Sequence, residues 1–465
     1  MSRRPSLSPP PSPRPLKRQR LDHLTSESFK NGVMLAPMVR SGSLPTRLFA
    51  LKHGATLVWS PEVVDKAILR AERVVDPNTG VISYNGVTKG IFTTHPIEKP
   101  FLIYQIGSAD PALAVQAAKT VQQDVSGIDL NCGCPKSFST HAGMGAALLT
   151  NPDLLCSILK ALRTAMPPEI TVSAKIRLLP TQEETLELVE RIVNTGISTL
   201  TVHCRTRNMR PREKALIGRM REVVEFVEKM GKGVAIVQNG DCLSREDAIR
   251  IRNITGAHSC MIATAAESNP TCFSPNPLPD LIKTFVPSYI RLGRYLDNHF
   301  SSTKFCAMTF KGASKDVRKA ERQNLMQQIH RAKSYGDLNE FVGGLWNGDE
   351  EMREIERSID SRVDGVLYPL EPVSLQSIQE EAREEAEENL KKLYIDSKEN
   401  LEPVTPMGDF GMKEIVSATP LDRENPEPVS TNAPLLPSNE RRLSLPALIL
   451  GEDTPTPSPT PRPRA

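Results

Sequence analysis

One cysteine stands where a thiol can do chemistry, at the end of a predicted strand and beside a run of small residues. The stretch Gly127-Ile-Asp-Leu-Asn-Cys-Gly-Cys-Pro-Lys136 begins apolar, stops at Asn131 and then turns through a glycine and a proline, which places Cys134 on a tight loop. The run Ala142-Gly-Met-Gly-Ala-Ala147 follows, and its glycines let backbone approach a ligand closely. Because an isolated cysteine in a turn is more often simply buried, the other motifs decide between the two interpretations.

Nearly every other predicted strand also ends in a group with chemical use. A lone lysine in a strand is usually an edge charge and a lone histidine is usually a core residue, so each group is weak evidence by itself. In a barrel of parallel strands, however, the carboxyl ends meet at one rim, where active sites lie. In strand order, the groups are Ala36-Pro37-Met38-Val39, Gln105, Asn131 with Cys134, Lys175 with Arg177, His203, Asn239-Gly240-Asp241, and Ala263-Thr264.

The elements that position these groups alternate regularly between strands and helices. Short β-branched runs, apolar on both faces as covered strands must be, predict strands at 33–38, 56–60, 101–106, 127–130, 170–176, 199–203, 234–238 and 259–263. Helical patterns fall between them at 45–53, 111–123, 152–165, 183–194, 219–229 and 245–253. Eight such units predict a (β/α)8 barrel, with an open doubly wound sheet as the alternative. The polar stretch 61–99 indicates an insertion.

The last two strand ends are suited to a phosphate. Barrels often bind phosphate there through backbone N–H groups, although Asn239-Gly-Asp241 is also an ordinary turn. A phosphate at this place indicates a phosphorylated cofactor across the barrel mouth. Lys175 would then lie near the cofactor ring and stabilise the negative charge of a reduced flavin. Gln105 can hydrogen-bond a pyrimidine-like ring edge, and Pro37 to Val39 can pack under the ring.

Composition excludes several classes of protein. The 465 residues carry a net charge of +3, and the 8 cysteines include no CxxC pair, so a reduced intracellular protein without a disulfide framework is expected. The Cys132/Cys134 and His203/Cys204 pairs lack zinc-site spacing, and we predict no metal. No apolar run reaches the ~18 residues of a membrane span, so we predict no membrane partner.

Charge and composition divide the chain into four expected regions. They are a disordered basic tail (1–28), the barrel (29–275), a small helical domain (276–345) and an acidic, then Pro/Ser-rich, mostly disordered tail (346–465). Residues 283–333 contain eleven Lys or Arg but only three Asp or Glu. This excess of positive charge favours a polyanionic partner over a helix surface that is merely solvated. The basic run 14–20 permits nuclear as well as cytoplasmic placement, and a mitochondrial presequence is not excluded. A monomer is expected.

Taken together, the motifs closely resemble the tRNA-dihydrouridine synthases, across about residues 32–340. The resemblance is greatest to the eukaryotic subgroup that acts at D-loop position 20, in a fungal form without an evident double-stranded-RNA-binding domain. The most specific part is Asn-x-Gly-Cys-Pro followed by Gly-Met-Gly-Ala. The motifs that carry the resemblance are Ala36-Pro-Met-Val-Arg40, Asn131-Cys-Gly-Cys-Pro135, Gly143-Met-Gly-Ala146, Lys175-Ile-Arg177, Val202-His-Cys-Arg-Thr-Arg207 and Asn239-Gly240.

The resemblance implies an enzyme that holds FMN, takes electrons from NADPH or NADH and reduces a uridine turned out of the tRNA. Hydride would pass to C6 of uracil, and Cys134 would deliver a proton to C5 as general acid, which needs a thiol that stays protonated. Asn131, Arg177, Arg205 and Arg207 would contact the substrate. The implied FMN-binding residues are Pro37, Met38, Val39, Gln105, Lys175, His203, Asn239, Gly240, Asp241, Ala263 and Thr264.

Two positions depart from the family pattern, and two other functions stay open. Arg is frequent in the family where this chain has Thr264, and a basic residue is frequent near His141; these changes put a phosphate contact and a tRNA or flavin contact in doubt. One alternative is a flavin-dependent barrel oxidoreductase that acts on a free small molecule. The other is a tRNA-binding protein that has lost catalysis.

Overall fold

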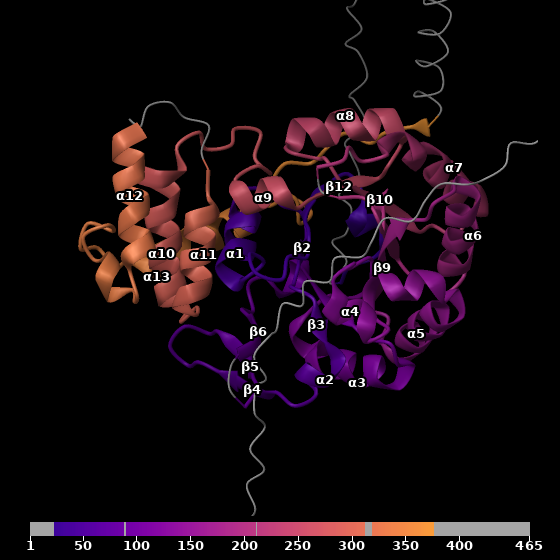
Figure 1. Ribbon diagram of the computed structural model, residues 1–465, viewed down its shortest axis with the longest axis horizontal. Coiled ribbons are helices and arrows are strands. Elements are labelled where there is room, and N and C mark those ends of the chain that lie inside the picture. Colours follow the sequence, from indigo (N-terminus) through magenta and orange to yellow (C-terminus); the bar gives the residue numbers. More distant parts are fainter. Residues whose placement is uncertain (1–22, 88–89, 211, 312–318, 376–465) are drawn as a thin grey trace, which may run out of the picture. The chain divides into compact units, whose positions relative to one another are not determined.

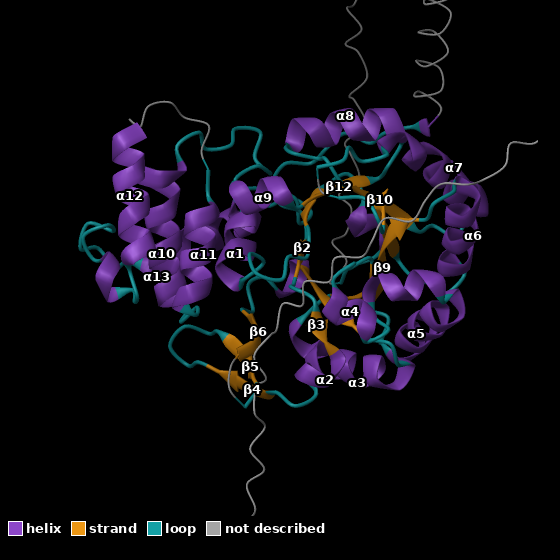
Figure 2. Cartoon of the chain, viewed as in Figure 1, coloured by secondary structure: helices purple, strands orange, loops and turns teal. Residues whose placement is uncertain are grey.

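The computed structural model describes residues 23–87, 90–210, 212–311 and 319–375. The predicted basic run at 14–20 and the acidic run at 380–388 lie outside these residues, as does the Pro/Ser-rich end of the chain. Figure 1 follows the chain from the barrel into the helices α10 to α13, and Figure 2 shows the same view by secondary structure.

Eight parallel strands close into a barrel. Around the ring they run β2-β1-β12-β11-β10-β9-β8-β7, and β2 also pairs with β7, which leaves no open edge between them. The predicted (β/α)8 barrel is therefore confirmed, and the open doubly wound sheet is wrong. The strands are β1 (Val33–Leu35), β2 (Val58–Trp59), β7 (Leu102–Gly107), β8 (Gly127–Cys132), β9 (Thr171–Leu178), β10 (Thr199–Thr206), β11 (Ala235–Asn239) and β12 (Ser259–Ile262).

Strand register brings the polar groups of neighbouring strands to one level of the barrel. Asn131 of β8 pairs with Lys175 of β9. His203 of β10 pairs with Arg177 of β9 on one side and with Asn239 of β11 on the other. Since all eight strands point the same way, these residues share the rim formed by the carboxyl ends.

Helices follow the strands and begin and end on the expected signals. Side chains of Asp110, Asn151, Thr181 and Ser244 accept N–H groups in the first turns of α3, α5, α6 and α8. Glycines 54, 196 and 231, which lie just after α1, α6 and α7, all have the positive φ that glycine tolerates at a helix end. The helices are α1 (Leu44–Lys52), α3 (Pro111–Val121), α4 (Ser137–His141), α5 (Pro152–Ala165), α6 (Gln182–Val193), α7 (Met220–Met230), α8 (Arg245–Thr255) and α9 (Thr264–Ser268).

The polar stretch after β2 is an insertion, as its composition indicates, and it contains a sheet that the sequence does not predict. β4, β5 and β6 form an antiparallel three-stranded sheet. Arg73 of β4 donates two hydrogen bonds of 2.7 and 2.8 Å to the Asp124 carboxylate, which anchors this sheet to the barrel. The insertion comprises β3 (Val63–Val64), α2 (Asp65–Ile68), β4 (Glu72–Val75), β5 (Ile82–Asn85) and β6 (Gly90–Thr94).

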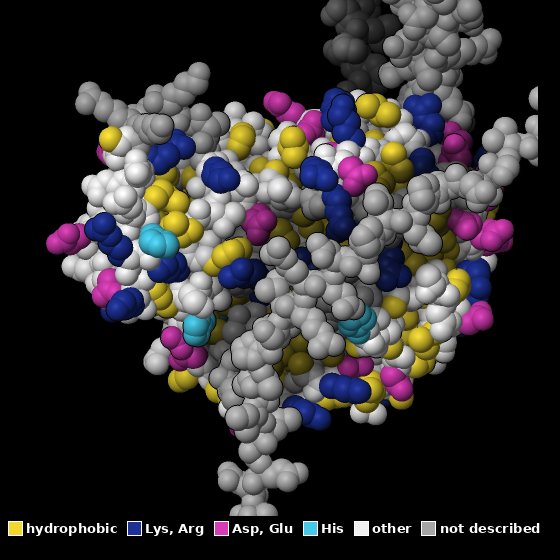
Figure 3. All heavy atoms as spheres, in the orientation of Figure 1, with side chains coloured by type: hydrophobic (Ala, Val, Ile, Leu, Met, Phe, Trp, Pro, Cys, Tyr) yellow, Lys and Arg dark blue, Asp and Glu magenta, His cyan; other side chains and the backbone are white. Residues whose placement is uncertain are grey.

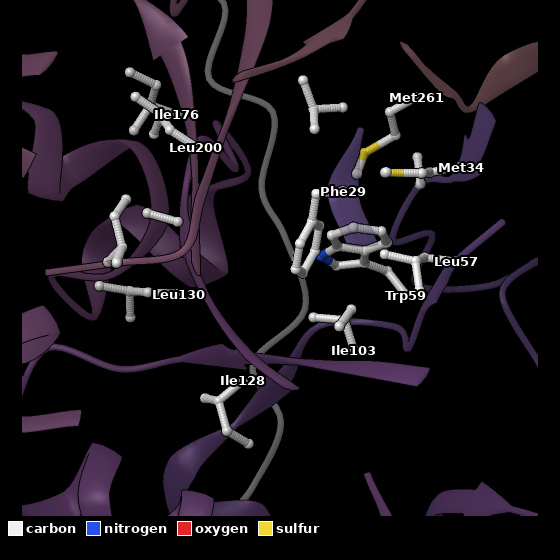
Figure 4. Close-up of a cluster of buried hydrophobic side chains, with 14 of the residues drawn as sticks. Phe29, Met34, Leu57, Trp59, Ile103, Ile128, Leu130, Ile176, Leu200 and Met261 are labelled. Atoms are coloured by element: carbon white, nitrogen blue, oxygen red, sulfur yellow. The ribbon is translucent and has the colours of Figure 1, made fainter. Parts of the chain in front are cut away.

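Large apolar side chains fill the barrel. Figure 4 shows Phe29, from the short helix that precedes β1, with its ring against the indole of Trp59, and their ring centroids are 6.2 Å apart. Met34 and Met261 lie beside this pair from β1 and β12, and all four side chains are fully buried. Because this end is filled by apolar side chains, the polar groups of the opposite rim are the ones left to face a ligand.

A second core lies between α1 and the helices that follow the barrel. The Phe49 ring of α1 contacts both Phe285 and Tyr289, with centroids 4.8 and 5.9 Å away. Tyr289 also hydrogen-bonds the Thr46 hydroxyl at 2.8 Å. These contacts fix the helical part on the barrel. It consists of the π-helical turn Leu281–Phe285, α10 (Val286–Tyr295), α11 (Phe300–Thr309), α12 (Lys319–Arg331) and α13 (Gly348–Asp360).

Packed structure continues past residue 345, where the sequence places the start of the acidic tail. α13 buries Met352 and Ile355, and residues after it return to the barrel. Arg362 donates to the Leu51 and Ala55 carbonyls at 2.6 and 2.9 Å, and Leu370 N–H donates to the Asn31 carbonyl at 3.1 Å. The acidic composition of α13 concealed its narrow apolar stripe. The domain boundaries stay predictions, but residues 346–375 pack against the rest of the chain.

The search for membrane-spanning helices covered only the residues that the structure describes. None of the helices there combines the length and the apolar character that crossing a bilayer requires.

Candidate active site

Two adjoining cavities open among the strand ends, and Arg177 and His203 line both. All but two of the predicted site residues line one cavity or the other. The first, of about 170 Å³, is lined by Pro37, Val39, Glu62, Gln105, Asn131, Gly133, Cys134, Pro135, Lys175, Arg177 and His203. The second, of about 270 Å³, is lined by Arg177, His203, Arg205, Met209, Asn239, Gly240, Asp241, Cys242, Leu243, Met261, Ala263 and Thr264.

Met38 and Arg207 are the two predicted residues that line neither cavity. The Met38 side chain is partly buried against the barrel core, and its sulfur accepts a hydrogen bond from Ser41 Oγ at 3.7 Å. Arg207 follows β10 and is exposed. The structure therefore places the Met38 side chain against the barrel core and Arg207 on the surface.

The loop that carries Cys134 is held from both sides. The Asn131 side-chain oxygen accepts the backbone N–H groups of Gly133 and Cys134, each at 3.0 Å. From the other side, Ala146 N–H donates to the Cys134 carbonyl at 2.9 Å. Gly145 has a φ of +59°, and a Cβ there would lie 2.7 Å from that carbonyl oxygen. The Gly-Met-Gly run is therefore required so that backbone can pack directly under Cys134.

Cys134 is a protonated thiol at neutral pH. It is half-buried, whereas the other seven cysteines are buried. Burial raises the pKa of the Cys134 thiol, and the negative charge of the nearby Glu62 carboxyl raises it further. A thiol held in this form can donate a proton but is a poor nucleophile, which agrees with the predicted general acid.

Gln105 presents its carbonyl oxygen to the first cavity. Its Nε2 donates to the Asp129 carboxylate at 2.8 Å, and Ser173 Oγ donates to the same carboxylate at 2.6 Å. Burial raises the pKa of Asp129 to about 6. Because the amide nitrogen is directed to Asp129, Gln105 Oε1 is left as an acceptor for an N–H of a ligand. Sequence analysis missed Asp129, although it lies two residues before Asn131 and so on the same face of β8.

The cavity also contains a cation that lacks a partner. Among the described residues, the Lys175 ammonium forms no hydrogen bond and no ion pair, and burial lowers its pKa to about 8. Burial and the neighbouring cations lower the pKa of His203 to about 2, so its imidazole is neutral. His203 Nε2 lies 3.3 Å from the Arg205 guanidinium, which can only donate, so this nitrogen accepts.

Arg177 connects two of the loops around the mouth. Its Nε donates to the Gly133 carbonyl at 2.8 Å, and its Nη1 donates to the Thr206 carbonyl at 3.1 Å. The side chain thus ties the Cys134 loop to the end of β10. Truncating it would disturb the position of Cys134 as well as remove a charge from the mouth.

The second cavity offers backbone rather than the Asp241 carboxylate. Asp241 accepts hydrogen bonds from the Arg205 guanidinium and, at 2.7 Å, from the Ala215 N–H, so both of its oxygens are used within the chain. Gly240 has a φ of +110°, and a Cβ there would come within 3.1 Å of the His203 ring. Only glycine at position 240 therefore leaves this part of the second cavity open. Arg177 lines the cavity there, and the Asp241 carboxylate is paired with Arg205, so this part is suited to an anionic group.

Glu62 is the main site residue that sequence analysis missed. It stands at the exit of β2, in Ser60-Pro-Glu62, and lines the first cavity together with Lys175 and Cys134. The motif carries no family signature that we recognised, and the residues after it are polar. The remaining signal was its place at a strand end. No cluster of three or more His, Cys, Asp or Glu able to hold a metal occurs within the described ranges.

Comparison with known proteins yields one family. The family model for dihydrouridine synthase matches residues 34–342. A tRNA-dihydrouridine(20) synthase of Schizosaccharomyces pombe is 46% identical over 319 residues, which cover 67% of this chain and 64% of that protein. The chain thus spans about 64% of the length of this relative.

Two further comparisons add detail. The tRNA-dihydrouridine(20) synthase of Saccharomyces cerevisiae is 42% identical, with 60% of this chain and 76% of that protein covered. The tRNA-dihydrouridine(20a/20b) synthase of the same yeast is 31% identical, with 51% and 60% covered. Among solved structures, a crystal structure of DHODH from Eimeria tenella aligns with a TM-score of 0.36 and 14% identity, covering 50% of this chain and 76% of that one. That score is too low to carry weight.

Proposed function

Because the chain belongs to the dihydrouridine synthase family, we propose that it reduces a uridine of tRNA to 5,6-dihydrouridine, with FMN as bound cofactor and NADPH or NADH as reductant. The observation that carries the proposal is the first cavity, into which the Cys134 thiol, the Lys175 ammonium and the Gln105 carbonyl all open. A proton donor, a cation and a ring-edge acceptor are the groups that such a reduction needs.

The residues around the two cavities fit FMN. A half-buried cation without a hydrogen-bond partner, such as Lys175, is costly unless a ligand places negative charge beside it, and a reduced flavin would supply that charge. Gln105 Oε1 suits the N–H of the pyrimidine-like ring, and Pro37 and Val39 supply an apolar wall. In the second cavity, the open corner at Gly240 and the Arg177 side chain suit a phosphate. Asn239, Ala263 and Thr264 would complete that end with backbone.

In the proposed reaction, bound FMN supplies a hydride to C6 of the uracil ring. The Cys134 S–H bond then breaks as a C5–H bond forms, so the ring gains two hydrogens and the sulfur is left as a thiolate. Asn131 holds the loop in place and would contact the uracil from the wall of the first cavity. Neutral His203 adds no positive charge that would compete with Lys175 for the ring.

Basic side chains outside the cavities would hold the tRNA. Figure 3 displays Lys and Arg side chains over both the barrel and the helical part of one face, with acids between them. Arg205 already bonds the Asp241 carboxylate and the Glu213 carbonyl, so we assign it to positioning and assign tRNA phosphate to the exposed Arg207. His141 and Thr264 stay the two positions where contacts to tRNA and phosphate differ from the family pattern.

The finer assignments follow the relatives' names. Higher identity to the (20) synthases than to a (20a/20b) synthase favours D-loop position 20 as the target. We further propose a monomer that acts in the cytoplasm or nucleus. The barrel (29–275), the helical domain (276–345) together with the packed residues 346–375, and the two tails outside them are proposed as the functional divisions of the chain.

The test is reduction of an unmodified tRNA transcript. The full-length protein, loaded with FMN and given NADPH, is expected to form dihydrouridine in the transcript, measured by nucleoside mass spectrometry, and to leave free uridine unchanged. Equal activity on free uridine would favour a small-molecule oxidoreductase. A protein that binds the tRNA but takes up no FMN at saturating concentration would favour lost catalysis. Either result contradicts the proposal.

A further inference from the structure

The carboxyl group of Glu62 is built into the floor beside Cys134. Gly107 of β7 makes room for it, because a Cβ on Gly107 would lie 2.6 Å from Glu62 Oε1. β3, which follows Glu62 directly, pairs with the same end of β7. Ser60, two residues earlier, accepts the Gln105 N–H at 2.9 Å. The Ser60 hydroxyl on one side and the pairing of β3 with β7 on the other therefore fix where this carboxyl lies.

Three side chains of the segment from Asn131 to Ser139 lie around the Glu62 carboxyl. Ser139 Oγ donates to Glu62 Oε1 at 3.5 Å. The Cys134 and Asn131 side chains are also neighbours of the group and favour its charged form. Glu62 Oε2 is buried and has no hydrogen-bond partner among the described residues. A buried acceptor without a donor is costly, and a small turn of the Cys134 side chain would satisfy it.

We propose that Glu62 is the positioning residue of the proton donor: its carboxylate accepts the Cys134 S–H before substrate binds, holds the sulfur at the edge of the cavity and opposes formation of the thiolate. This role rests on the proposed reduction of uridine, in which Cys134 must begin each turnover protonated. When the thiol has given its proton to C5, a thiolate next to a carboxylate is unfavourable. The sulfur therefore regains a proton from water, and the donor is reset.

Other charges at the mouth act in the opposite direction. Lys175 and Arg177 from β9 line the same cavity and favour the thiolate, as does the Lys136 N–H at the start of α4. His203 from β10 is neutral, and Asp129 of β8 is directed to Gln105 and Ser173. Glu62 is thus the acidic side chain lining this cavity that counters the cations. Removing its charge should release their effect on Cys134.

The test measures how fast iodoacetamide alkylates Cys134 across pH in the full-length protein, read by peptide mass spectrometry. Only the thiolate reacts, so the rate reports the Cys134 titration midpoint. In Glu62→Gln, which keeps the side-chain shape, the midpoint is expected to fall by about one pH unit, so alkylation at pH 7.5 rises about tenfold. Glu62→Asp, which withdraws the charge by one methylene, is expected to fall between Gln and wild type.

Controls separate electrostatics from loosening. Glu72→Gln makes the same chemical change on the exposed strand β4, and its midpoint should equal that of wild type. The seven buried cysteines stay unmodified while the protein is folded, so they report unfolding in the same sample. A faster reaction at every pH without a shifted midpoint would mean a structural role only.

Coincident profiles for wild type and Glu62→Gln would overturn the inference. If Glu62→Gln fails to fold, a Glu62→Asp midpoint equal to wild type would overturn it instead. The assay needs neither tRNA nor NADPH, so failure of the proposed function would leave its result intact. If the protein does reduce tRNA, turnover of Glu62→Gln should be lost at a lower pH than wild type, because the general acid deprotonates earlier.

Discussion

Two groups of charged side chains in this molecule differ in how far their hydrogen-bonding atoms have partners within the chain. Behind the mouth, Arg47 of α1 meets Glu98 of the insertion through two hydrogen bonds of 2.9 and 2.7 Å. The remaining Arg47 donors bind the Gly42 and Thr93 carbonyls, and Thr94 donates to Glu98. At the mouth, Glu62 Oε2 is buried without a hydrogen-bond partner within the described ranges, and the half-buried Lys175 side chain forms no hydrogen bond or ion pair there. The first site is closely hydrogen-bonded, whereas the second leaves groups available to a ligand.

The difference indicates what each site is for. A buried ion pair whose guanidinium donates four hydrogen bonds holds the insertion against the barrel, and breaking it leaves an uncompensated charge. Unsatisfied groups that face a cavity reduce the stability of the empty protein and gain partners from a ligand. Mutations at the mouth should therefore change function with little loss of stability, and mutations at the Arg47–Glu98 pair should do the reverse.

The largest effect is expected at Cys134. Cys134→Ala should lower the rate of dihydrouridine formation by about 10²–10⁴-fold, the usual contribution of a general acid. FMN content, read from the absorbance of the purified protein, should stay unchanged because the thiol is not needed to hold the ring. Full turnover in this variant would show that another group donates the proton.

The Arg47–Glu98 pair is expected to give the next largest effect, on stability. Glu98→Ala leaves the Arg47 guanidinium buried without its carboxylate, which typically costs about 3–5 kcal/mol. Urea denaturation should show this loss as a lower midpoint. The same change at exposed Glu72 serves as the control and should be within about 0.5 kcal/mol of wild type. A small effect at Glu98 would erase the contrast between the two sites.

Lys175→Met should move stability and activity in opposite directions. Without flavin, the variant is expected to be about 1–2 kcal/mol more stable than wild type at neutral pH, because a buried unpaired charge is gone. With flavin and tRNA, its turnover should fall. A flavin-free variant less stable than wild type would mean that Lys175 has a partner which it supports.

The pH dependence of that stability difference gives a smaller, sharper test. Burial lowers the pKa of Lys175 to about 8, below its unfolded value of about 10.4. Below pH 8 the folded protein carries the penalty of the charged form. As pH rises from about 8 to 10.4, the folded lysine is neutral while the unfolded one still binds a proton, so wild-type stability should gain on Lys175→Met. Thermal melts of both flavin-free proteins would detect a constant difference if this is wrong.

The smallest effect is expected on the surface. Arg207→Ala should weaken tRNA binding a few-fold and lower the slope of log affinity against log salt by about one, as for one lost phosphate contact. Arg221→Ala, on α7, is the control, because the Arg221 guanidinium bonds the Ile254 carbonyl within the chain and is not expected to contact tRNA. An unchanged salt slope in Arg207→Ala would remove this residue from the tRNA surface.

Much of the fold, and most residues at the barrel mouth, can be predicted from the sequence because the ends of the strands can be recognised in it. Each apolar run stops at a polar residue, and a closed parallel barrel brings those stops together. The pattern does not show which atoms of a side chain are already engaged. The Asp241 carboxylate, for example, bonds Arg205 and Ala215, which leaves its backbone for the predicted cofactor contact. The Met38 side chain likewise packs against the core, and its contact with FMN stays a prediction.

The residues that sequence reasoning missed share a cause. Glu62 and Asp129 become functional only through neighbours from other strands, and no local spacing announces those neighbours. The acidic composition of α13 concealed the apolar positions Met352 and Ile355, which pack on the helical part. Arg362 follows, and its burial against α1 depends on contacts more than 300 residues away in sequence. Such long-range contacts leave no periodic pattern in the sequence from which they could be predicted.

Position-resolved mapping of dihydrouridine in tRNA from cells that lack this protein tests the central claim most directly. We expect dihydrouridine to disappear from position 20 of the D loop in these cells. It should return when the wild-type chain is restored, but not with Cys134→Ala. An unchanged dihydrouridine profile in the cells without the protein would contradict it.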